Sequence, residues 1–247
     1  MSVLSIDLAL ASYRDVGAAL VQAAPGGEIT ARVVRIPQVG RPTADALVTW
    51  MEEVAAHAAV RCIAIDGPLG WRGPDTDSPH ARLSERAVRA PGKTGLPPEG
   101  VKPRTYLEFT RLSIAIFERL TQQGWQLPGE PTARNARRDV NYATETFPTA
   151  AWRGLGIAPP PGKARSSAAD VAAGLVRLTS ALPIDVSGVR THDDLQAVVG
   201  GIAPAWWMTN ALDRVSFVGA PPFRLEGAWR EGFILVPTDR QKASRSD

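Results

Sequence analysis

Cysteine and histidine are scarce in this 247-residue chain. Cys62 is its single cysteine, so no disulfide can form within one chain and a cysteine-based zinc site is not expected. The three histidines, His57, His80 and His192, include no His-x-x-x-His pair, which argues against a histidine-rich metal site. Polar chemistry is therefore left mainly to carboxylates and arginines.

Long apolar runs are missing as well. No run approaches the roughly 18 residues that a membrane-spanning helix needs. Residues 1–6 form a short apolar start without the basic segment of a secretory signal. The composition, 44% hydrophobic and 21% charged, is ordinary for a soluble globular protein and excludes a mainly disordered chain. We therefore expect a cytoplasmic protein that makes no membrane contact.

Glycine-rich phosphate loops are also absent. The chain contains no Gly-x-Gly-x-x-Gly, no Walker loop and no Gly-x-Ser-x-Gly elbow. Nothing specific therefore points to a nucleotide-cofactor enzyme or to a serine hydrolase.

Lysine is rare and arginine is abundant. Of the 28 basic residues, 24 are arginine and four are lysine, and the net charge is +3. Arginine suits bidentate binding of phosphate, but an excess of this size does not by itself indicate a nucleic-acid partner. A genome of high GC content, which favours arginine and alanine codons, is the plainer explanation.

Apolar periodicity predicts an α/β fold whose first third runs β-β-β-α-β. The predicted strands cover residues 3–9, 16–21, 29–36, 61–66 and 142–147, and the predicted helices cover 42–57, 105–123, 148–155, 167–182 and 191–207. Residues 217–237 are expected to form a short strand or loop. We expect one domain over residues 1–237, followed by a polar tail at 238–247.

A long segment at about 72–104 interrupts this pattern. It is rich in glycine, proline, arginine and aspartate, and connections of this length are typically functional loops or lids. Within it, Arg82, Arg86 and Arg89 have the spacing of one face of a short helix. They are candidates for holding a phosphate backbone, or form a solvated helix face.

Acidic residues end or follow several apolar segments. Asp7, Asp66 and Glu145 lie on predicted strands, and Asp193 with Asp194 lies in the first turn of a predicted helix. If the three strands are adjacent and parallel, their acids converge at one edge of the sheet, where open α/β sheets bind ligands. Converging carboxylates need a neutralising cation. Oxygen-only ligands favour Mg²⁺ or Mn²⁺. Two such ions about 4 Å apart can stabilise the attacking and the leaving oxygen when water displaces a phosphoryl group.

Each acid also has a simpler explanation. Asp7 and Glu145 are compatible with solvated strand positions, and Glu145 also with the N-terminus of the following helix. Asp66 precedes Gly-Pro and suits a turn. Asp193 and Asp194 suit helix capping.

Further basic residues are candidate substrate contacts. Arg134 and Arg138 belong to a basic cluster that either grips a nucleic-acid backbone or forms a solvated loop. Lys163 lies in a Pro/Gly connector from which it can reach a phosphate.

Four short motifs, in order, resemble the predicted-nuclease family known as domain of unknown function 429. They are SIDLA at 5–9, IDGPLGW at 65–71, ETFP at 145–148 and DDLQA at 193–197. The ending from EGAW at 226–229 to Val236-Pro237 also resembles that family. The resemblance covers residues 3 to 237.

The resemblance implies an RNase H-like fold: a five-stranded mixed sheet of order β-β-β-α-β-α-β-α, with helices on both faces. It implies that Asp7 and Asp66 are the core metal ligands and that Glu145 belongs to a Glu-x-x-Pro element. The family often has Asp immediately before the residue that is Ala197 here. This chain has Gln196 instead, so Asp193 or Asp194 is expected to substitute.

The sequence therefore favours a nuclease that depends on Mg²⁺ or Mn²⁺ and hydrolyses DNA or RNA. Asp7 is expected to bridge two ions, Asp66 and Glu145 to hold one each, and Asp194 or Asp193 to complete the second site. A nucleic-acid-binding protein with a degenerate site is the alternative that Gln196 favours. A small-molecule phosphotransferase or ATPase is a third, although residues 8–12 contain no glycine.

Overall fold

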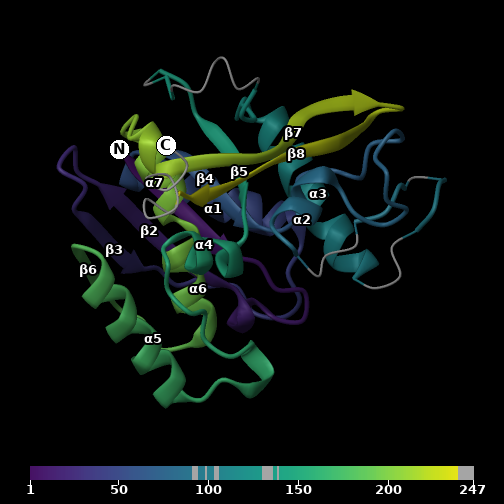
Figure 1. Ribbon diagram of the computed structural model, residues 1–247. Helices are drawn as coiled ribbons and strands as arrows, with labels where there is room; N and C mark the ends of the chain where they lie inside the picture. The colour runs from purple at the N-terminus through teal and green to yellow at the C-terminus, as the bar shows by residue number, and fades with distance from the viewer. Residues whose placement is uncertain (91–93, 98, 103–105, 130–135, 138, 239–247) are drawn as a thin grey trace.

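A single eight-stranded mixed sheet forms the centre of the molecule (Figure 1). The computed structural model describes residues 1–238, apart from 91–93, 98, 103–105, 130–135 and 138. The strands are β1 Ser2–Asp7, β2 Gly17–Ala23, β3 Ile29–Val33, β4 Val60–Asp66, β5 Tyr142–Thr146, β6 Ile184–Ser187, β7 Val215–Leu225 and β8 Ala228–Pro237. They are arranged in the order β6-β3-β2-β1-β4-β5-β8-β7.

Five neighbouring strands, β3-β2-β1-β4-β5, have the directions that the sequence predicts. β1, β2 and β3 form an antiparallel meander, and β4 and β5 continue the sheet in parallel with β1. The predicted total of five strands is wrong, because β6 extends one edge and the β7–β8 hairpin extends the other.

The three additional strands have weak sequence signals. β6 has only four residues and pairs along one side with β3. β7 contains Pro221 and Pro222, which usually argue against a strand. It tolerates them because it is an edge strand and because its register with β8 shifts between Ala220 and Phe223.

Helices pack against both faces of the sheet. They are α1 Ala44–Ala58, α2 Leu83–Ala87, α3 Leu107–Gln122, α4 Pro148–Gly154, α5 Ala168–Ala181, α6 His192–Gly200 and α7 Ile202–Met208. The helix predicted over 191–207 is two helices that meet at Gly201. Pro204 has no N–H to donate to the carbonyl of Gly200, and the Thr146 hydroxyl on β5 donates to that oxygen instead at 2.9 Å.

Alternating residues of the central strands supply two separate cores. Val3, Cys62 and Ala64 face α4, α5, α6 and α7, whereas Leu4 and Ile63 face α1 and α3. This alternation places the side chains of Asp7 and Asp66 on the face of the sheet that α6 covers. No helix among the described residues is both long and apolar enough to cross a membrane.

The described parts of the segment at 72–104 are held against β8 by buried polar groups. Glu231 accepts hydrogen bonds from the N–H groups of Gly73 and Leu83, at 2.7 and 3.0 Å. Arg230 donates to the carbonyl of Pro97 at 2.7 Å. The arginine face predicted there is wrong, because α2 ends at Ala87, and Arg82 is buried while Arg86 is exposed.

Candidate active site at the carboxyl end of the central strands

Asp7 and Asp66 end neighbouring parallel strands. They are the last residues of β1 and β4 and stand directly opposite each other in the register. The expected convergence of these two acids is therefore present in the structure. Their side chains lie close enough for a hydrogen bond between them to raise the pKa of Asp7 and to lower that of Asp66.

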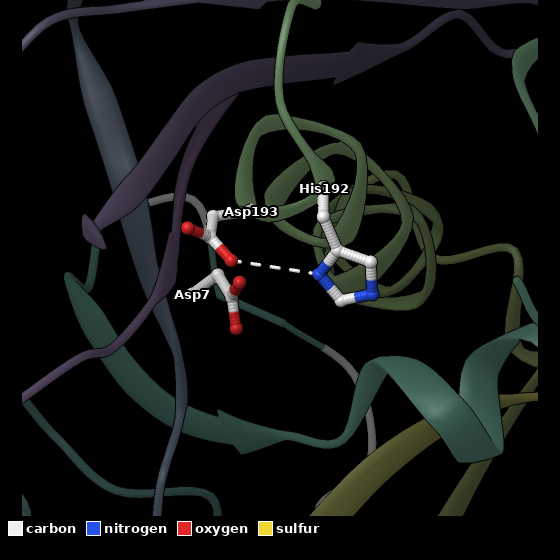
Figure 2. Close-up of side chains that lie close together, drawn as sticks. All are labelled: Asp7, His192 and Asp193. Atoms are coloured by element: carbon white, nitrogen blue, oxygen red, sulfur yellow. Dashed lines mark hydrogen bonds and ion pairs between the residues drawn. The ribbon is translucent and has the colours of Figure 1, made fainter. Parts of the chain in front are cut away.

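The N-terminus of α6 brings two further side chains to Asp7. Figure 2 shows Asp193 and His192 beside it. One ligand atom from each of the three residues lies within 4.8 Å of the others. Asp7, Asp66, Asp193 and His192 are called the acid cluster below.

Gly17 allows α6 to approach this closely. It pairs with Asp7 across β1 and β2. A Cβ atom on Gly17 would lie 2.0 Å from the carbonyl oxygen of Asp193, far inside van der Waals contact. The position of Asp193 beside Asp7 therefore depends on the missing side chain at Gly17.

The carboxyl groups of the acid cluster repel one another in a partly enclosed site. Burial and the nearby charges of Asp66 and Asp193 raise the pKa of Asp7 well above its usual value. Burial and the charge of Glu145 raise the pKa of Asp66 to about 7. Both shifts show that the site disfavours its own negative charge, as a site for a cation does.

Lys163 places a positive charge beside the carboxylates of the acid cluster. Its Nζ lies 2.6 Å from Asp193 and 2.9 Å from Asp15. Burial raises the pKa of Asp193, but hydrogen bonds from His192 and Lys163 outweigh it and hold that pKa below its usual value. Lys163, which the sequence predicts to contact a phosphate, lies beside Asp193 of the acid cluster.

A chain of hydrogen bonds fixes the orientation of His192. The indole N–H of Trp152 can only donate, and it donates to the Oε1 of Gln196 at 3.0 Å. The Nε2 amide of Gln196 must then donate to the Nε2 of His192, 3.0 Å away. The His192 proton is consequently on Nδ1, which faces the Oδ1 of Asp193 at 3.5 Å. In this state His192 orients Asp193 rather than offering a free lone pair to a metal.

Asp194 does not join the acid cluster. Its carboxylate receives a bidentate contact from Arg35, at 2.6 and 3.0 Å. It also accepts from the backbone N–H groups of Arg190 and Thr191 and completes a capping box with Thr191. Four donors occupy its oxygens, so Asp194 anchors the start of α6 while Asp193 faces Asp7.

Glu145 is near Asp66 but is held by an arginine. Arg82 donates to its two carboxylate oxygens at 2.6 and 2.8 Å, and the N–H of Leu69 donates at 2.9 Å. Burial alone would lower the pKa of Arg82, but Glu145 and Glu85 outweigh it and raise that pKa. Arg82 is buried in this contact, so its side chain does not offer the exposed phosphate contact that the sequence predicts.

The other predicted basic contacts lie away from the acid cluster or outside the described residues. Arg86 is exposed and donates to the carbonyl of Asp77. Arg134 and Arg138 are not among the described residues.

Two features of the site were not predicted. The orienting roles of His192 and Gln196 come from contacts across α4 and α6, which the sequence pattern does not reveal. A pocket of about 290 Å³ also opens beside Asp66, lined in part by Glu85, Tyr106 and Phe109. Its lining comes from separate segments of the chain, so no local sequence pattern indicates the pocket.

The raised pKa of Asp66 predicts how metal-free stability depends on pH. Because the folded protein holds this proton more tightly than the unfolded chain does, protonation of Asp66 stabilises the fold. That contribution is complete at acidic pH and is lost as the pH rises through about 7. We expect the melting temperature in EDTA to fall between pH 5 and pH 8, and Asp66→Asn to flatten this dependence. A wild-type melting temperature that stays constant or rises over this range would contradict the prediction.

Substitution of Gly17 is predicted to weaken metal binding without removing a ligand. The Cβ of Gly17→Ala must displace the backbone of Asp193. Changes that misplace a ligand in this way typically weaken metal affinity about 10- to 100-fold. Calorimetric titration with Mn²⁺ measures the effect. Gly26→Ala is the matched control, since its Cβ would meet nothing within 4 Å, and equal affinities for the two variants would refute the role of Gly17.

No family model matches the chain, and no curated protein matches it. The resemblance to domain of unknown function 429 therefore rests on its motifs alone. Among solved structures, the chain is similar to RuvC of Thermus thermophilus, with 11% identity and a TM-score of 0.43, over 90% of this chain and 99% of that one. It is also similar to Ydc2, the yeast mitochondrial Holliday junction resolvase, with 10% identity and a TM-score of 0.41, over 84% of this chain and 77% of that one. At these values neither similarity carries an argument about activity.

Proposed function

We propose that this chain is a metal-dependent nuclease of RNase H-like architecture that hydrolyses phosphodiester bonds. The observation that carries the proposal is the convergence of Asp7, Asp66 and Asp193 from β1, β4 and α6. The order and directions of strands β3-β2-β1-β4-β5 support the architecture.

The donor set fits a hard divalent cation. Asp7, Asp66 and Asp193 offer carboxylate oxygens, which Mg²⁺ and Mn²⁺ prefer. Burial and the neighbouring carboxylates raise the pKa values of Asp7 and Asp66 although Lys163 lies at the site, so the metal-free site disfavours negative charge on them. We assign these three residues as ligands. Glu145 and Asp194, which the sequence also suggested, are supporting residues because Arg82 and Arg35 already occupy them.

A bound divalent cation would activate water and stabilise charge on the phosphate. The residues of the chain have separate tasks around it. Asp7 and Asp66 hold the charge at the end of the sheet, and His192 keeps the Asp193 carboxylate turned toward them. Lys163 is half exposed at the same carboxylate, from where it can turn to a phosphate once Asp193 binds a cation.

Gln196 does not leave the site incomplete. Its amide is bonded to Trp152 and His192, and Asp193 supplies the carboxylate from the late helix. The structure of this helix start therefore favours a working site over a degenerate one.

The test is a cleavage assay on single-stranded, duplex, hybrid and branched nucleic acids with Mn²⁺ or Mg²⁺. We expect cleavage by the wild type and a loss of about a thousandfold in Asp193→Asn, because a metal site contributes several kcal/mol to this chemistry. Asp15→Asn is the matched control, since Asp15 also binds Lys163 but is outside the acid cluster.

Four outcomes would count against the proposal. Metal-independent cleavage, or equal cleavage by Asp193→Asn and Asp15→Asn, would remove the assigned site. Salt-dependent binding of nucleic acid without cleavage of any substrate would support the degenerate protein instead. Stabilisation by ATP would support the phosphotransferase.

A further inference from the structure

A pocket of about 290 Å³ lies on the α3 side of Asp66 and has no role in the chemistry described so far. Its lining comes from the ends of β4 and β5, from α2 and from the start of α3. Asp66 belongs both to this pocket and to the acid cluster. A molecule bound at the cluster therefore has the pocket directly beside it.

Aromatic side chains form much of the pocket wall. Tyr106, Phe109 and Phe147 line it together with the apolar side chains of Pro68 and Ile234. Tyr106 immediately precedes α3, and 68% of its surface is exposed, an unusual state for an aromatic residue beside a pocket. Aromatic walls bind flat, conjugated rings by stacking.

The charged groups in the described lining of the pocket are all carboxylates, and the hydroxyl-bearing residues Thr94, Thr110, Thr146 and Tyr106 lie among them. Glu85 and Glu145 line it alongside Asp66. Among the described residues, Arg82 contacts two of these carboxylates: it is buried and directs its guanidinium to Glu145 and Glu85. The hydroxyl of Thr94 also donates to Glu85. Carboxylate oxygens repel a phosphate but accept hydrogen bonds from the amino group of a base.

We propose that this pocket receives a nucleobase with an exocyclic amino group, from the nucleotide next to the phosphate that is cleaved. This inference rests on the proposed function, since it takes the phosphate to lie at the acid cluster. A base that leaves its stack to enter such a pocket is read by stacking and by hydrogen bonds along its edge. Adenine, cytosine and guanine have an exocyclic amino group, whereas thymine has none. The pocket therefore selects against thymine at this position.

The test measures binding of single nucleosides without metal and without cleavage. Deoxyguanosine, deoxyadenosine, deoxycytidine and thymidine are titrated into the full chain in EDTA, and saturation-transfer NMR reports the affinity of each. We expect the three amino-bearing nucleosides to bind several-fold more tightly than thymidine. We expect Phe109→Ala and Tyr106→Ala each to weaken their binding about tenfold, as loss of a stacking partner does.

Phe223→Ala is the matched control because Phe223 is also an exposed aromatic residue but lies on the β7–β8 hairpin, outside the pocket lining. Its nucleoside binding should equal that of the wild type. Tyr106→Ala keeps the test informative if Phe109→Ala fails to fold, since Tyr106 is largely exposed.

The outcomes separate this inference from the proposed function. No nucleoside binding, equal binding of thymidine, or equal losses in Tyr106→Ala and Phe223→Ala would overturn the pocket assignment even if the protein cleaves nucleic acid. Selective nucleoside binding that depends on Tyr106 would support the pocket even if no substrate is cleaved.

Discussion

Asp7→Asn is expected to abolish cleavage while making the metal-free protein more stable. The substitution removes one of the carboxyl groups that repel each other at the ends of β1 and β4. It also removes a proposed ligand, for which we expect a loss of activity of about a thousandfold. In EDTA at pH 8 the melting temperature should rise above that of the wild type. Functional sites commonly show this opposition between stability and activity.

With Mn²⁺ bound, the wild type should become more stable than Asp7→Asn, the opposite of the order expected in EDTA. Mn²⁺ should raise the melting temperature of the wild type, because a ligand that binds only the folded state stabilises it, and should have little effect on Asp7→Asn. Scanning calorimetry with and without Mn²⁺ measures both effects, with Asp15→Asn as the control. If Asp7→Asn melts below the wild type in EDTA, carboxylate repulsion is not what limits the metal-free protein.

Among the variants proposed here, Arg82→Met is expected to lower the free energy of unfolding the most. It leaves the Glu145 carboxylate buried without its partner, next to Asp66. Breaking a buried ion pair from one side typically costs about 3–5 kcal/mol. For a chain of this length that corresponds to a melting temperature lower by roughly 10 °C. Urea denaturation gives the free energy directly.

The double variant Arg82→Met/Glu145→Gln identifies the cause of that loss. If the unpaired carboxylate is responsible, the second substitution should restore much of the stability. Arg137→Met is the surface control, because Arg137 and Asp139 are each 69% exposed and such pairs contribute little. A double variant no more stable than Arg82→Met would show that the packing of Arg82 matters more than its charge.

The central part of the fold could be predicted because its signals are local. β1, β2 and β4 are largely apolar runs and β3 alternates, and the acids Asp7 and Asp66 stand at strand ends where parallel pairing brings them together. The strands beyond this centre could not be recognised in the same way. β7 contains adjacent prolines, and only its pairing with β8 makes it a strand.

Helix capping decides which of Asp193 and Asp194 faces Asp7. Thr191 and Asp194 have the spacing of a capping box, which the sequence contains and in which Asp193 takes no part. The partner of Asp194, Arg35, lies 159 residues away in the sequence and no local pattern connects them. The same holds for Arg82 and Glu145, 63 residues apart. These long-range ion pairs hold the carboxylates of two suggested ligands, Asp194 and Glu145, against arginines.

The position of Asp66 between the acid cluster and the pocket has an evolutionary consequence. The groups that would perform the chemistry come from β1, β4 and α6, whereas Glu85, Tyr106 and Phe109 of the pocket wall come from α2, α3 and the residue before α3. These two sets are encoded in different parts of the gene, and Asp66 belongs to both the acid cluster and the pocket lining. Under the proposed base binding, mutations around residues 85–110 would alter which base is preferred and leave Asp7 and Asp193 unchanged. Related proteins could then differ in the base that they prefer without an inactive intermediate in their evolution.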